Sequence, residues 1–116
     1  MSRLSRSLSR LSAVLLFAAA GLALAQEAGS DAIAALGRLN GVALACSQPA
    51  LNARLREIIV NTAPKTRAAG EAFEQATQTA YLAHGQQGAA CPDGKTLSEQ
   101  IAAGEAALQQ AYRKVP

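Results

Sequence analysis

The sequence contains no tryptophan and only one histidine, and these shortages narrow the classes of function. Acid–base and nucleophilic catalysis usually need a poised base, and zinc or copper sites need several His, Cys or carboxylate ligands at close spacing. The one histidine, His84, is interpreted as a helix-end residue that interacts favourably with the helix dipole. We therefore expect a non-enzymatic protein with no catalytic residues, no metal site and no cofactor.

The sequence also lacks a real excess of positive charge. Three of its 11 Lys and Arg residues are Arg3, Arg6 and Arg10, which leaves 8 basic residues against 8 acidic ones in the rest of the chain. A nucleic-acid-binding protein needs basic residues to replace counterions on phosphates, and usually aromatic residues to stack on bases. With balanced charge and 3% aromatic residues, a nucleic-acid partner is not expected.

No apolar run is long enough for a membrane-spanning helix, which takes about 20 residues. The longest apolar run covers residues 11–24. Three arginines and no acidic residue precede it. Ala23-Leu24-Ala25 then has the small-x-small pattern that signal peptidase recognises. We predict a cleavable signal peptide over residues 1–25 and a single domain over residues 26–116. The protein is then periplasmic or secreted, without a permanent membrane anchor.

The two cysteines, Cys46 and Cys91, both lie in the part of the chain that we expect to be exported. In an oxidising compartment, an even pair with no third cysteine to compete predicts a disulfide. A domain this small gains limited stability from its core, and closing so long a loop contributes about 4 kcal/mol in the chain-entropy model. Because there is no Cys-x-x-Cys motif, we expect the bond to be structural rather than redox-catalytic.

Apolar residues recur at helical spacing in four stretches, and none alternates as a strand would. We predict an all-α fold, a small bundle of about four short helices stapled by the disulfide. The first helix is expected over about residues 31–45, with Ser30 or Asp31 as its N-cap. Gly37 and Gly41 lie four apart on it. Since glycine weakens a helix by about 1 kcal/mol relative to alanine, this pair predicts that another backbone passes close by.

The next two helices are separated by a proline. We expect Ser47 to cap the second helix with Pro49 in its first turn, and Pro64 to end it. The third helix then runs from Pro64 to about His84, with Gly85 as its stop. The expected inner faces carry Leu51, Leu55, Ile58 and Ile59 in the second helix, and Ala69, Phe73, Ala76 or Thr77, and Ala80 in the third.

A loop is expected over residues 86–94, followed by a fourth helix. Thr96 and Glu99 have the spacing of a capping box, in which each side chain satisfies a backbone donor near the other. The apolar stripe of this helix consists of Leu97, Ile101, Leu108 and Tyr112.

The densest polar segment, residues 64–74, lies at the start of the third helix. Charge pairs four residues apart on a solvated helix face contribute only a few tenths of a kcal/mol, so a solvated helix entrance explains this segment without a ligand. The functional alternative is a binding patch, whose candidate residues are Lys65, Arg67, Glu71 and Glu74.

Several segments resemble small exported two-cysteine helical proteins of Gram-negative bacteria, namely residues 38–46, residues 63–67, residues 73–77 and Cys91-Pro92. The resemblance covers most of the expected mature chain and implies no activity. The size and the single long-range disulfide also resemble those of periplasmic acid-stress chaperones. The Trp-containing segment that precedes the first cysteine of those chaperones has no counterpart here.

These observations favour an exported accessory or protein-binding domain whose partner is a protein of the cell envelope. A periplasmic stress chaperone and a small-ligand carrier are the alternatives. The sequence identifies neither the partner nor the oligomeric state.

Overall fold

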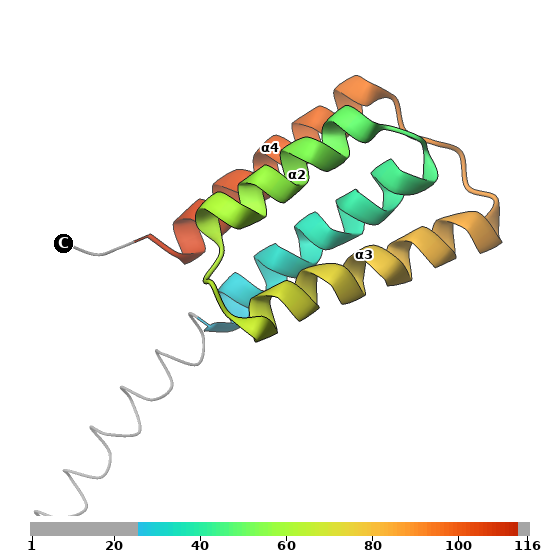
Figure 1. The fold of residues 1–116 in the computed structure, drawn as a ribbon. Helices are drawn as coiled ribbons and strands as arrows, with labels where there is room; N and C mark the ends of the chain where they lie inside the picture. The colour runs from blue at the N-terminus through green and yellow to red at the C-terminus, as the bar shows by residue number, and fades with distance from the viewer. Residues whose placement is uncertain (1–25, 114–116) are drawn as a thin grey trace, which may run out of the picture.

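The computed structural model describes residues 26–113, so the predicted signal peptide and residues 114–116 lie outside the described residues. The described part is built of helices, without a strand, and confirms the predicted all-α bundle (Figure 1). Its four helices are an N-terminal helix over residues 26–45, α2 (Pro49–Thr62), α3 (Arg67–Gln87) and α4 (Gly94–Ala111). Within residues 26–113, no helix combines the length and the apolarity needed to cross a membrane.

The helices pack as two pairs around a shared core. Helix α2 lies beside α4, and the N-terminal helix lies beside α3 (Figure 1). The predicted apolar stripes of α2 and α4 supply completely buried large side chains to the core, among them Leu55, Leu97, Ile101 and Leu108. The N-terminal helix adds Leu36, which is also completely buried. Burying apolar area at about 25 cal/mol per Å² is the main stabilising contribution that these side chains make.

The close backbone approach predicted from Gly37 and Gly41 is confirmed. A Cβ added to Gly37 would lie 2.7 Å from the carbonyl oxygen of Phe73 in α3. A Cβ added to Gly41 would lie 2.7 Å from the Cβ of Ala80 and 2.8 Å from the backbone nitrogen of Tyr81. These separations are shorter than van der Waals contact, so the two helices cross at this distance only because glycine occupies both positions.

A buried polar network also joins three of the helices. Asn40, almost completely buried in the N-terminal helix, donates a hydrogen bond of 3.2 Å to the Thr77 hydroxyl in α3. Thr77 in turn donates to the carbonyl of Phe73, at 2.8 Å. Asn52 of α2 donates to the Asn40 side-chain oxygen, at 2.8 Å. Because buried polar groups are costly when unpaired, this network favours one relative placement of the helices.

The predicted start of the first helix was wrong. Residues 26–30 are already helical, so Ser30 and Asp31 lie inside the helix and cap nothing. Gln26, Glu27 and Ala28 are good helix formers. Gly29 is buried, and a Cβ there would collide with the Tyr112 ring. This contact with Tyr112, at the C-terminal end of α4, stabilises the helical turn over residues 26–30, which local sequence signals did not predict.

The predicted cap of α2 was also wrong, although its first and last turns were predicted correctly. Ser47 has a left-handed backbone, with φ of 56°, and the N-cap is Gln48, which makes no side-chain capping bond. Pro49 occupies the first turn as expected. At the other end, Ala63 is extended, with φ −74° and ψ 153°, as a residue before proline should be.

Helix α3 begins and ends three residues later than predicted. Its N-cap is Thr66, whose hydroxyl accepts a 3.1 Å hydrogen bond from the Ala69 amide, so Pro64 belongs to the preceding bend. Gly85 lies within the helix, and Gly88 ends it in a left-handed conformation with φ of 59°. Glycine adopts that conformation with little strain, which explains why the helix ends there.

The predicted capping box of α4 was wrong as well. Asp93 is the N-cap, and its carboxylate accepts a 2.7 Å hydrogen bond from the Thr96 amide. The hydrogen bonds from Thr96 lower the pKa of Asp93 below its usual value. An aspartate at this position is at least as good a cap as threonine, so the helix starts earlier than the Thr96 and Glu99 pattern suggested.

Candidate functional site

The larger candidate site is a groove of about 650 Å³ between α2 and α3. Three of the four residues predicted as a binding patch line it: Arg67, Glu71 and Glu74. The fourth, Lys65, does not, since its ammonium group donates to the carbonyl of Val60 at the end of α2. The structure therefore brings most of the predicted patch to one side of a groove.

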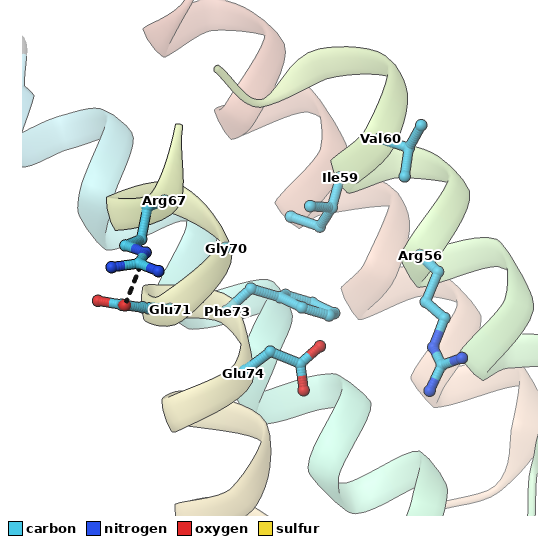
Figure 2. Close-up of a pocket in the computed structure, with 8 residues that line it drawn as sticks. All are labelled: Arg56, Ile59, Val60, Arg67, Gly70, Glu71, Phe73 and Glu74. Carbon is cyan, nitrogen blue, oxygen red and sulfur yellow. Dashed lines mark ion pairs between the residues drawn. The ribbon is translucent and has the colours of Figure 1, made fainter. Parts of the chain in front are cut away.

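The floor of the groove is apolar. Phe73 of α3 extends toward α2 beneath Ile59, and both side chains also pack in the core (Figure 2). Val60 lines the same groove and is 59% exposed, which makes it one of the most exposed large apolar side chains of the described chain. An apolar side chain of a ligand or partner could cover this surface and remove it from water.

The rim of the groove carries charges of both signs. Arg67 and Glu71 form an ion pair of 3.8 Å along α3, with 91% and 71% of their side chains exposed (Figure 2). Arg56 of α2 and Glu74 of α3 face each other across the floor (Figure 2). An exposed ion pair such as Arg67–Glu71 contributes less than about 1 kcal/mol, so these two charges can exchange partners at little cost.

Sequence reasoning missed the α2 side of this groove. Arg56, Ile59 and Val60 were not among the predicted patch residues, although Ile59 was assigned to an apolar stripe. The available signal was that Ile58, Ile59 and Val60 are consecutive, and three adjacent positions of a helix cannot all face one core. Only the packing of α2 against α4 shows which of them faces α3.

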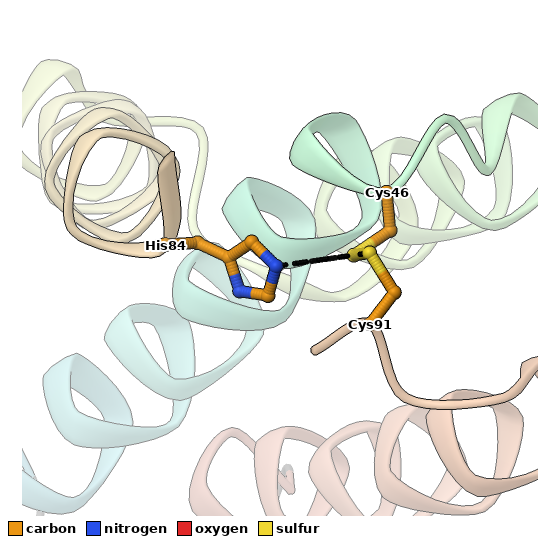
Figure 3. Close-up of side chains that lie close together, drawn as sticks. All are labelled: Cys46, His84 and Cys91. Atoms are coloured by element: carbon orange, nitrogen blue, oxygen red, sulfur yellow. Dashed lines mark hydrogen bonds between the residues drawn. A yellow bond between two sulfur atoms is a disulfide. The ribbon is translucent and has the colours of Figure 1, made fainter. Parts of the chain in front are cut away.

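A second cluster lies at the opposite end of the bundle, where the predicted disulfide between Cys46 and Cys91 is confirmed (Figure 3). Its Cα atoms are 5.7 Å apart, and it joins the end of the N-terminal helix to the loop before α4, as expected. The Nε2 atom of His84 lies 3.5 Å from Cys46 Sγ and 3.7 Å from Cys91 Sγ (Figure 3).

His84 does lie in the last turn of α3, as the sequence predicted, but the helix-dipole interpretation is incomplete. Cys46 and His84 are half-buried and Cys91 is exposed, and their three ligand atoms lie within 4.8 Å of one another. The expectation of no metal site rested on the shortage of closely spaced ligands, because the chain offers one histidine and its two cysteines were expected to be oxidised. His84 is 38 residues from Cys46, so only the fold brings this cluster together.

A smaller hollow of about 280 Å³ lies next to His84. Tyr81 and Leu82 line it, and they are 48% and 52% exposed. This hollow places exposed apolar side chains beside the disulfide end of the bundle.

No known protein family, curated protein or solved structure matched the chain when its sequence and its fold were compared with them.

Proposed function

We propose that this chain is an exported, non-enzymatic accessory domain of the bacterial envelope that binds a partner protein in the groove between α2 and α3. The observation that carries the proposal is the apolar floor of the groove, where exposed Val60 and half-buried Ile59 lie with the buried Phe73 and are bordered by charges of both signs. Apolar anchors surrounded by a polar rim are typical of protein interfaces.

The ligand that fits this groove is a peptide segment of a partner protein. A small-molecule site usually encloses most of its ligand, whereas this groove is open to solvent. Because Arg56 and Arg67 lie on the rim with Glu71 and Glu74, the partner segment should carry one apolar anchor with an acidic and a basic residue beside it. An amphipathic helix laid in the groove meets these requirements.

Two features support export. The N-terminal sequence has the basic, apolar and small-x-small regions of a signal peptide, and the bundle carries a disulfide, which persists in oxidising compartments. The resemblance to small two-cysteine proteins of Gram-negative bacteria favours the periplasm as the compartment of the proposed mature protein.

The proposal is tested by placing a photocrosslinking residue at Val60 in the protein expressed in intact cells. Gln100, which is exposed on α4 and does not line the groove, serves as the matched control position. We expect a discrete crosslinked product from Val60, none from Gln100, and a weaker product when Arg67→Glu is added to the Val60 variant. Equal products from both positions, or none from either, would contradict groove binding.

A stress chaperone is the second candidate, and the exposed Tyr81 and Leu82 favour it. A chaperone should expose more apolar surface on acidification. Binding of an apolar dye that rises as the pH falls, while the far-UV circular dichroism is retained, would favour this candidate over a stable accessory domain.

A further inference from the structure

We propose that the reduced form of the protein binds a thiophilic metal ion, Zn²⁺ or Cu⁺, through Cys46, His84 and Cys91. The three residues come from the end of the N-terminal helix, the last turn of α3 and the loop before α4 (Figure 3). Their ligand atoms already lie within 4.8 Å of one another. This inference goes beyond the proposed partner binding and does not depend on it.

The distances from His84 to the two sulfurs match those of a metal site. In a tetrahedral zinc site the metal lies about 2.0–2.1 Å from a histidine nitrogen and about 2.3 Å from a thiolate sulfur, which puts the nitrogen and the sulfur about 3.6 Å apart. The observed separations from His84 Nε2 are 3.5 Å and 3.7 Å. The histidine is therefore already in place for both sulfurs.

Only the two sulfurs have to separate. Two thiolates on one zinc ion lie about 3.8 Å apart, so the disulfide must first be broken. A dithiol reductant supplies two electrons and two protons and becomes a disulfide itself, while the bond between the sulfurs breaks and both cysteines become thiols. Cys91 is exposed and lies in the loop between α3 and α4, so it can move without disturbing the core.

Binding of the ion would then release the two thiol protons, because the thiolate is the form that ligates a metal. Two thiolates balance the charge of Zn²⁺, and neutral His84 adds the third ligand. Sulfur ligands favour Zn²⁺ and Cu⁺ over Mg²⁺ and Ca²⁺. The disulfide form has no thiolates, so the oxidised protein should release the ion, and the redox state should control metal binding.

The full exported chain is tested in two states, as the disulfide and after reduction with a dithiol that is then removed anaerobically. Zn²⁺ is titrated in competition with a chromophoric chelator, and Cu⁺ is titrated in a parallel experiment. We expect one ion per reduced chain and none on the oxidised chain. His84→Gln, which keeps both thiols, should weaken binding at least tenfold, whereas Gln86→Ala, a change in the same turn of α3, should leave it unchanged.

Each outcome decides the proposal. Binding of Cu⁺ without Zn²⁺ supports the site and assigns it to copper. If reduction unfolds the bundle, recovery of helical circular dichroism on adding either ion supports the site, and no recovery contradicts it. Equal affinity of the wild type and His84→Gln overturns it, because two thiols alone would then explain binding. Metal binding to the oxidised chain, or none to the folded reduced chain, also overturns it.

Discussion

Gly41→Ala should destabilise the bundle, although alanine is normally the better helix residue. In an open helix position this substitution would contribute about 1 kcal/mol of stability. Here the new Cβ would lie 2.7 Å from the Cβ of Ala80 and 2.8 Å from the Tyr81 backbone nitrogen. Neither atom belongs to a flexible side chain, so relief requires the N-terminal helix and α3 to move apart.

Overpacking of this kind typically costs about 1–3 kcal/mol. After the gain in helix propensity is subtracted, the net loss should reach about 2 kcal/mol. For a domain of this size, each kcal/mol changes the melting temperature by about 4–8 °C. A thermal melt followed by circular dichroism should therefore show a decrease of up to about 16 °C, and Gly41→Leu should lower the melting temperature further.

Gly85→Ala is the matched control, because Gly85 lies in α3 with nothing within 4 Å of its added Cβ. It should raise the melting temperature by about 4–8 °C, the effect of about 1 kcal/mol of helix propensity. Opposite signs for the two substitutions would support the close crossing. A Gly41→Ala protein as stable as the Gly85→Ala protein would refute it.

Three further predictions concern the disulfide and the N-caps of α3 and α4. Cys46→Ser and Cys91→Ser should each lower the free energy of unfolding by about 4 kcal/mol, because either change opens the same loop. Denaturant titrations measure this loss, and a free energy of unfolding that does not change on reduction would contradict it. Thr66→Ala should cost about 1 kcal/mol in the same assay, because the Ala69 amide loses its capping acceptor; no loss would mean that this cap contributes nothing to α3. Because the folded pKa of Asp93 is lowered, its charge stabilises the fold above the unfolded pKa, and this contribution is lost as the pH falls through the folded value. Between about pH 5 and about pH 2, the melting temperature should therefore fall less steeply for Asp93→Asn, which keeps a capping oxygen, than for the wild type. An equal decrease in the melting temperature of both proteins would refute this role of Asp93.

The helices and the core were predictable because both follow from spacing along the chain. Leu55, Ile58, Leu97, Ile101 and Leu108 were placed on inner faces by their period alone, and all are buried. The disulfide and the close helix crossing were also predictable. Two cysteines without a third, and two glycines four residues apart in a helix, each have one dominant structural use in a small helical domain.

The helix ends were not predictable in the same way, because several residues compete for each cap. Ser47 and Thr96 are both good capping residues. However, the backbone of Ser47 is left-handed, and Asp93 precedes Thr96 and caps α4 in its place. In residues 26–30 of the N-terminal helix, the contact between Gly29 and Tyr112 joins positions too far apart in the sequence for any local signal to predict it.

The candidate sites were predictable only where their residues are close in sequence. Arg67, Glu71 and Glu74 were found because they form one dense polar segment, whereas Arg56 and Val60 reach the groove from another helix. His84 approaches the two sulfurs because α3 runs parallel to the N-terminal helix, so that both helices end at the same end of the bundle. A lone histidine in a sequence carries no sign of such a neighbour.

The most direct test of groove binding is the affinity of the partner captured at Val60, measured with purified proteins. Val60→Lys places a charge on the apolar floor, whereas Gln100→Lys adds the same charge to an exposed position on α4 outside the groove. Losing a central anchor of an interface costs about 2 kcal/mol or more, which corresponds to a loss in affinity of about 30-fold. We expect that loss of affinity for Val60→Lys, with a wild-type melting temperature, and unchanged affinity for Gln100→Lys. Equal affinities of the two variants would contradict groove binding.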